Sequence, residues 1–296
     1  MTKKELEKKL EQDISLEQKI EYLNRLSKPY IKNNKKKIFF DQYMNGDGSE
    51  LKCKFWSKHS SSRIAFDLYS CLANDNTVDD FEFEYQLPGI LFKNKESGVP
   101  NMDVYYQKGS TIYFIESKFT ESPKDSLPQA YYIDTDEYKN TKNQLRVEPI
   151  KNRFRNNSYV ASEFSRFSKN YKDKTEHIDK KDWFDYKQEI CHLFGIIFYA
   201  KEKITTSTIN QIDFRNIVYD FDDYEILGKE HISQSALEFI NDAKDLINRI
   251  FEHEKINIKF SYNYDFIQRI LPEYENKNAY GTELSVKDIM KQYLIG

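Results

Sequence analysis

The sequence is poor in cysteine, with Cys53, Cys71 and Cys191 among its 296 residues. The three are far apart, show neither CxxC nor Cys/His spacing and are odd in number, which argues against a zinc site and a disulfide framework. No apolar run approaches the ~20 residues that cross a membrane, and the charged start MTKKELEKKLEQ has no apolar signal segment. We therefore expect a reduced, soluble, cytoplasmic protein without membrane contact.

The chain also lacks an excess of charge of either sign. Although 31% of its residues are charged, the formal net charge is -3, so any basic surface for a nucleic acid must be local. The 39% hydrophobic and 15% aromatic residues suffice for a core and argue against global disorder. The length allows one large domain or two small ones.

Helix and strand patterns are mixed along the chain. Hydrophobic periodicity predicts helices over 4–27, 59–75, 182–194, 233–254 and 285–294. Apolar and alternating runs predict strands over 81–87, 102–108, 111–119, 195–201, 214–221 and 256–262. This mixture predicts an α/β fold, or a related α+β arrangement, with a mixed central sheet flanked by helices. We expect a helical arm over 1–45 and a single domain over 46–296, with a basic insertion at about 120–181.

The stretch FIESKF, residues 114–119, places Glu116 and Lys118 inside an apolar strand. Side chains alternate along a strand, so these two charges point to one face, where they must be paired, solvated or functional. One interpretation is an ion pair of structural importance alone, worth ~0–1 kcal/mol if it lies at the surface. The apolar neighbours favour a functional role.

Asp103 is expected to join this pair across a hairpin. The turn at Gly109-Ser110 brings residues 103–107 alongside 112–116, so Asp103 and Glu116 converge near one end of the two strands. Two converging carboxylates repel, and Mg²⁺, which takes hard oxygen ligands, removes the repulsion. A lysine beside such a metal can hold or deprotonate an attacking water and offset charge on a phosphate.

The spacing Pro-Asn-Met-Asp, twelve residues, then Glu-x-Lys resembles the PD-(D/E)XK nuclease signature, with the aspartate displaced within the leading motif. Five ordered blocks together resemble a family of bacterial type II restriction endonucleases: GDGSEL (46–51), HSSS (59–62), FEYQLPG (83–89), PNMDV (100–104) and ESKFTE (116–121). The resemblance covers roughly residues 45–121 and is weaker around 188–192.

The resemblance implies a restriction-endonuclease-like core and a Mg²⁺-dependent DNA endonuclease of restriction or anti-phage defence, with Mn²⁺ as a substitute cation. It implies catalytic roles for Asp103, Glu116 and Lys118, with Asp103 and Glu116 as metal ligands. Glu84 matches the glutamate of the family's FE block and would complete the ligand set. A solvent-facing strand position explains Glu84 equally well.

The resemblance further implies that Gln188 and His192, four residues apart on one helix face, lie near the substrate. For the histidine, a satisfied buried or surface position is an equal alternative. We expect His59 and Ser60 to bind phosphate at a helix N-terminus, although helix capping alone explains the serine.

A local basic segment at 139–174 holds ten Lys or Arg against three acidic residues, with interleaved aromatics. Such a segment is typical of one that tracks a phosphate backbone, and we select Lys151, Arg153 and Arg155 as DNA-binding residues. A solvated insertion is the alternative.

Two other functions stay open at the level of sequence. One is a catalytically inactive nucleic-acid-binding or assembly protein on the same fold, and the other is an RNA-directed nuclease. A homodimer and a cognate methyltransferase are the further partners that the resemblance allows.

Overall fold

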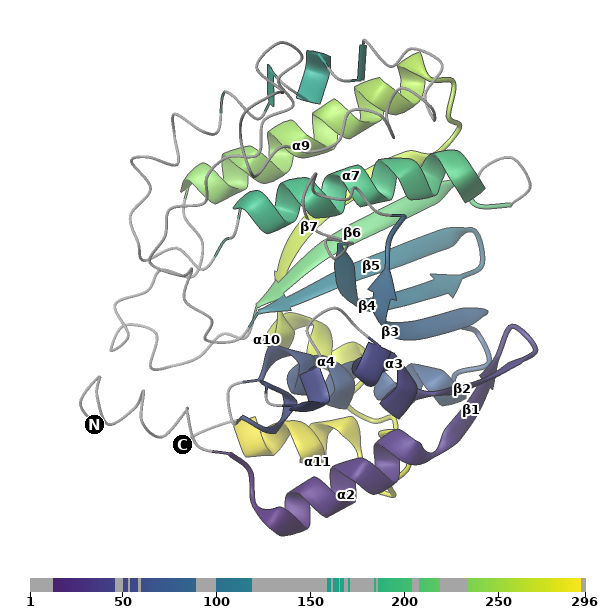
Figure 1. Ribbon diagram of the computed structural model, residues 1–296, viewed down its shortest axis with the longest axis vertical. Coiled ribbons are helices and arrows are strands. Elements are labelled where there is room, and N and C mark those ends of the chain that lie inside the picture. Colours follow the sequence, from purple (N-terminus) through teal and green to yellow (C-terminus); the bar gives the residue numbers. More distant parts are fainter. Residues whose placement is uncertain are drawn as a thin grey trace.

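The computed structural model describes residues 13–45, 50–52, 54–57, 60–88, 100–118, parts of 159–170, 184, 186–203, 208–218 and 234–293. Within these ranges the chain forms a sheet between two layers of helices (Figure 1). None of the helices in the described part is long and apolar enough to cross a membrane.

The central sheet has, within the described ranges, five strands in the order β3-β4-β5-β6-β7. Their bounds are β3 Asp80–Gln86, β4 Asn101–Lys108, β5 Thr111–Lys118, β6 Gln211–Val218 and β7 Lys259–Phe266. The first three strands pair antiparallel, whereas β5, β6 and β7 pair parallel. The predicted α/β class with a mixed central sheet is therefore confirmed.

The β4–β5 hairpin closes through a two-residue turn at Gly109 and Ser110. Gly109 has φ +57°, a conformation that glycine adopts without steric cost. The turn sets the register, in which Lys108 pairs with Thr111 and Val104 pairs with Ile115. The predicted alignment of residues 103–107 with 112–116 is confirmed.

Helices cover both faces of the sheet. Their bounds are α2 Leu16–Ser27, α3 Phe39–Asn45, α4 Ser61–Tyr69, α7 Tyr186–Lys203, α9 Gln234–His253, α10 Ile267–Ile270 and α11 Val286–Met290. Helices α7 and α9 lie on one side of the sheet, and α2, α3, α4 and α11 lie on the other (Figure 1). Parallel strands need crossover connections, and α7 and α9 lie in the connections from β5 to β6 and from β6 to β7.

The expected strand at 195–201 is wrong, because these residues continue α7. Residues 195–200 are all buried, and Phe194 just before them packs against Phe164 at a ring distance of 3.8 Å. A helix covered on several sides carries apolar residues all round, so its short apolar run resembles a buried strand. The other predicted helices and strands are present with shifted ends wherever they fall within the described residues.

The N-terminal segment shares the core of the sheet. A small hairpin of β1, Pro29–Lys32, and β2, Lys35–Ile38, joins α2 to α3. Buried side chains from residues 16–45, namely Tyr22, Leu26, Tyr30, Phe39 and Tyr43, belong to the same apolar cluster as the strands. Within the described residues, the segment expected as an arm thus packs against the domain from Ile14 onward.

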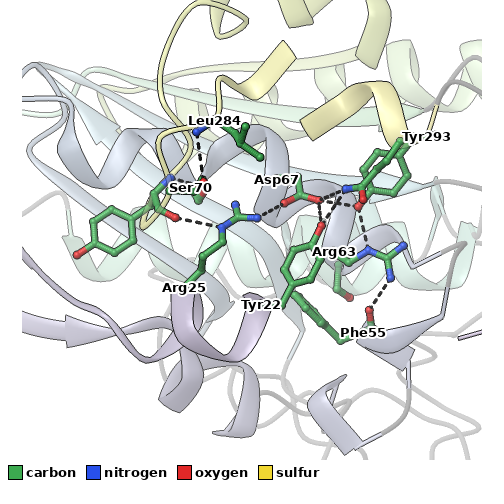
Figure 2. A network of polar contacts seen from close by, with 12 residues as sticks. Tyr22, Arg25, Phe55, Arg63, Asp67, Ser70, Leu284 and Tyr293 are labelled. Atoms are coloured by element: carbon green, nitrogen blue, oxygen red, sulfur yellow. Dashed lines mark hydrogen bonds and ion pairs between the residues drawn. The ribbon is translucent and has the colours of Figure 1, made fainter. Parts of the chain in front are cut away.

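A fully buried carboxylate, Asp67 of α4, connects helix α2 and the segment around Tyr293 to this helix (Figure 2). Arg25 of α2 forms an ion pair with it at 3.0 Å, and the hydroxyls of Tyr22 and Tyr293 donate hydrogen bonds to its other oxygen. The Tyr293 hydroxyl in turn accepts a hydrogen bond from Arg63 at 2.9 Å. One charge therefore holds α2, α4 and the C-terminal segment together.

Replacing Asp67 with alanine should unfold the protein at much lower urea concentration. The substitution leaves the Arg25 guanidinium buried without its counter-charge, and such a break costs ~3–5 kcal/mol. The control is Asp13→Ala, which removes the exposed partner of Lys19 and should change the unfolding free energy by less than ~1 kcal/mol. Equal effects of the two substitutions would contradict a central role for Asp67.

Candidate active site

Three carboxylates occupy adjacent positions on three neighbouring strands. Because Val104 pairs with Ile115, Asp103 of β4 lies opposite Glu116 of β5. In the pairing of β3 with β4, Phe83 lies opposite Val104 and Tyr85 lies opposite Met102. Glu84, between them, therefore lies opposite Asp103. Residues opposite one another in antiparallel strands are close neighbours, so the register gathers the three predicted metal ligands.

Glu116, Lys118 and Gln188 form a buried triangle, in which each side chain is hydrogen-bonded to the other two. The Glu116 Oε1 atom accepts hydrogen bonds from the Lys118 ammonium and from the Gln188 amide, each at 2.7 Å. The Lys118 ammonium also donates to the Gln188 Oε1 atom at 2.8 Å. Glu116 and Lys118 are 3% and 6% exposed, so their pair is a buried one and not a surface ion pair.

Helix α7 carries both Gln188 and a second residue, His192, that lies beside Glu116. Gln188 and His192 lie four residues apart on this helix and therefore share a face, as the sequence predicts. The His192 Nε2 atom is 3.8 Å from Glu116 Oε2, and the ring is buried edge-on against Phe214 of β6. The structure thus brings both predicted helix residues to Glu116.

Asp103 is held in place by the backbone of the ExK strand. Its Oδ2 atom accepts a hydrogen bond from the Ser117 N–H at 2.6 Å. Burial, followed by the negative charges of Glu116 and Glu84, raises the pKa of Asp103 well above its ordinary value, although Lys118 opposes the shift. The crowding of like charges is therefore only partly relieved by the lysine.

Glu84 interrupts the regular alternation of β3. Its φ of +49° is rare for a residue with a side chain. Phe83 packs against Phe39 on the α3 face, whereas Tyr85 stacks on Tyr105 and approaches Tyr199 of α7 on the other face. A strained residue at a carboxylate cluster is typical of a functional position, and Glu84 is buried rather than solvent-facing.

Ser60 lies away from this cluster. It is the N-cap of α4, where its hydroxyl accepts a hydrogen bond from the Arg63 N–H at 3.1 Å, and it is buried. The capping explanation is therefore confirmed, while the expected phosphate contact of Ser60 stays a prediction; α4 itself packs on the sheet face opposite α7 (Figure 1). His59 lies outside the described residues.

The basic segment is described in part. Lys151, Arg153 and Arg155 lie outside the described residues. Phe164 and Phe167, two of its aromatics, are buried in the core, so they are packing residues rather than a stacking surface for bases.

The sequence did not single out three polar residues beside the cluster. The Tyr262 hydroxyl donates to Glu189 Oε2 at 2.6 Å and accepts from the Asn216 amide at 2.9 Å. Asn216 is the parallel-strand neighbour of Glu116. Nothing local in the sequence marks these residues, because their position depends on pairing between β5, β6 and β7.

The carboxylates of Asp103, Glu116 and Glu84 fit Mg²⁺ by their chemistry. Mg²⁺ is usually held by one or two carboxylates with water and phosphate oxygens in the remaining positions. Burial first, and then the negative charges of Glu116 and Glu84, raise the pKa of Asp103, and a cation at this place would offset those charges. Within the described ranges, however, no three His, Cys, Asp or Glu side chains are already arranged as a metal-ligand group. The carboxylates therefore suit Mg²⁺ by their oxygen donors and their negative charge, and two carboxylates are enough to bind this ion.

Asp103→Asn should stabilise the protein in chelator-containing buffer. A raised pKa contributes stability that is complete below the ordinary value of 3.8 and is lost as the pH rises through the raised value. The melting temperature of the variant should therefore exceed that of the wild type by a margin that grows as the pH rises from the ordinary value of 3.8 toward the raised one. The exposed Asp245→Asn on α9 is the control. A variant less stable than the wild type throughout this range would refute the crowding.

Comparison of the chain with protein-family models, with curated proteins and with solved structures gave no match in any of the three.

Proposed function

We propose that the protein is a Mg²⁺-dependent DNA endonuclease with a PD-(D/E)XK-type site on a restriction-endonuclease-like core. The observation that carries the proposal is the placement of Asp103, Glu116 and Lys118 at one point of the β4–β5 hairpin, with Gln188 bonded to two of them. The order of the motif and its position on adjacent strands of a mixed sheet support the proposal together.

The residues divide the work of phosphodiester hydrolysis. Bound Mg²⁺, or Mn²⁺, would supply Lewis-acid activation and charge neutralisation at the phosphate. Asp103 and Glu116, with Glu84 beside them, would hold the cation, and Gln188 fixes the orientation of Glu116. Lys118 holds the attacking water and offsets charge on the phosphate. The water oxygen bonds to phosphorus, the bond to the leaving sugar oxygen breaks, and the water proton is passed to solvent while the leaving oxygen is protonated.

A second function is favoured by one feature of the same site. The Lys118 ammonium is engaged by both Glu116 and Gln188, an arrangement that also suits a structural ion pair. In a catalytically inactive nucleic-acid-binding or assembly protein, Lys118 would keep its contacts with Glu116 and Gln188 at all times and would not act on a substrate. An RNA-directed nuclease would differ from the first proposal in its substrate alone.

A cleavage assay separates these functions. Plasmid DNA, phage DNA and structured RNA are each incubated with the protein in Mg²⁺, Mn²⁺, Ca²⁺ or EDTA. We expect DNA cleavage with Mg²⁺ and Mn²⁺ and none with EDTA. Cleavage of RNA alone supports the RNA-directed enzyme, and binding without cleavage under all conditions supports the inactive protein. The defence setting, with a homodimer and a cognate methyltransferase as partners, rests on the resemblance.

Lys118→Met should abolish cleavage and leave DNA binding nearly intact. The methionine keeps an apolar stem and removes the charge that acts on the water and phosphate. Lys201→Met is a matched control, because Lys201 lies on α7 and faces Glu254 at 3.7 Å, away from the triangle. Cleavage and DNA affinity are measured for both variants.

Thermal and urea unfolding of Lys118→Met test the structural alternative. If the pair is structural, Glu116 is left buried and unpaired at a cost of up to ~3–5 kcal/mol. A large loss of stability, together with a wild type that cleaves nothing, would contradict the catalytic role.

Neutralising Lys151, Arg153 and Arg155 together should weaken DNA binding and flatten its dependence on salt. Each lost phosphate contact lowers the slope of log affinity against log salt by about 0.9, so three contacts lower it by about 3. Neutralising Lys36, Lys52 and Lys108, which lie outside the basic segment, is the control. An unchanged slope would mean that the basic segment is a solvated insertion.

A further inference from the structure

Glu189 is a buried acidic residue that has no part in the proposed hydrolysis. It follows Gln188 directly in the first turn of α7 and is completely buried. Successive residues on a helix point about 100° apart. Gln188 therefore reaches toward β5, while the carboxyl of Glu189 meets Tyr262 of β7 at 2.6 Å.

A chain of hydrogen bonds connects this carboxyl to the parallel half of the sheet. The Asn216 amide of β6 donates to the Tyr262 hydroxyl, which donates to Glu189 Oε2. Asn216 is also the strand neighbour of Glu116. The first turn of α7 is consequently attached at two points, at Gln188 to β5 and at Glu189 to β7, which fixes its rotation about the helix axis.

The surroundings of Glu189 favour its protonated, neutral carboxyl form. Its Oε1 atom and the Oδ1 atom of Asn216 are both buried acceptors without a hydrogen-bond partner, and a proton on the carboxyl would supply a donor in that region. Burial, followed by the charge of Glu116, raises the pKa of Glu189 to about 8. A neutral carboxyl adds no second negative charge beside Glu116, and its carbonyl oxygen still accepts the Tyr262 hydrogen bond, although the bond is weaker than one to a carboxylate.

We propose that Glu189 and Tyr262 are positioning residues, whose hydrogen bond fixes the first turn of α7 so that Gln188 keeps its contacts with Glu116 and Lys118. The expected effect on cleavage kinetics rests on the proposed function. The expected effect on the Gln188 contacts rests on the geometry alone. The pair touches no group that bonds to the cation or the water in the proposed reaction, and it acts through Gln188.

Kinetics of Tyr262→Phe test the proposal in the cleavage assay. Removal of the hydroxyl should lower kcat about 10- to 100-fold, as is usual when a supporting contact of a metal ligand is lost, with little change in KM. The control is Tyr43→Phe, which removes another buried hydroxyl, one that donates to the Ser62 carbonyl beneath the opposite face. Equal kcat values for the two variants would overturn the proposal.

Two substitutions at Glu189 separate positioning from a chemical role for its carboxylate. Glu189→Gln retains an oxygen for the Tyr262 hydroxyl and resembles the neutral acid, so it should keep nearly the wild-type kcat. Glu189→Leu removes that acceptor and should match Tyr262→Phe. If Glu189→Gln folds but loses as much kcat as Glu189→Leu, the carboxylate itself is required and the proposal is wrong. These variants also serve if Tyr262→Phe does not fold.

Side-chain amide resonances of glutamine give a readout that does not need cleavage. The protein is labelled with ¹⁵N-glutamine, and the Gln188 signal is assigned by its loss in Gln188→Leu. Tyr262→Phe should shift this signal, whereas Tyr43→Phe and Glu189→Gln should leave it nearly unchanged. A wild type that cleaves no nucleic acid overturns the proposed function alone, while an unmoved Gln188 signal in folded Tyr262→Phe overturns the positioning role.

Discussion

The burial of Glu116 is the constraint on which the candidate site depends. A carboxylate that is 3% exposed is costly unless charged and hydrogen-bonding partners surround it. Lys118 supplies the charge from the same strand, because side chains two residues apart share a face. Gln188 supplies a second donor, and it can do so only because the first turn of α7 lies over the end of β5. The position of helix α7 and the charge pattern of strand β5 therefore act together to stabilise the buried Glu116 carboxylate.

Asp67 is a buried carboxylate outside the candidate site, and its surroundings differ from those of Glu116. Asp67 is matched by Arg25 and by two tyrosine hydroxyls, so its charge is balanced within the fold. At the site, burial raises the pKa of Asp103, the charges of Glu116 and Glu84 raise it further, and Lys118 opposes the shift without cancelling it. A buried carboxylate whose charge is matched by a cation stabilises a fold, whereas a cluster of carboxylates with too few cations is typical of a position that binds or reacts. This contrast separates the candidate site from the structural network in the same chain.

Local rules were sufficient for the hairpin and its charges, and they failed where contacts are distant in sequence. The glycine turn fixes the pairing of Asp103 with Glu116 within a few residues, so alternation alone predicts their shared position. The apolar run at 195–201 has no comparable marker, and its burial within α7 depends on packing against other segments. Asn216 and Tyr262 become neighbours of the site through parallel pairing, which no spacing in the sequence specifies. At Ser60 the sequence could not separate capping from phosphate binding, because both use the same residue type.

The site lies where the two halves of the sheet meet. Strand β5 has an antiparallel neighbour, β4, on one side and a parallel neighbour, β6, on the other. An antiparallel neighbour is reached by a short turn, which delivers Asp103 opposite Glu116 with little freedom. A parallel neighbour requires a crossover, and the crossover contains α7, which carries Gln188 and Glu189. A strand at this junction can therefore combine a rigidly placed carboxylate from one side with helix residues from the other. The same junction explains why the positioning contacts proposed for Glu189 come from β7, two strands away from the residues that they serve.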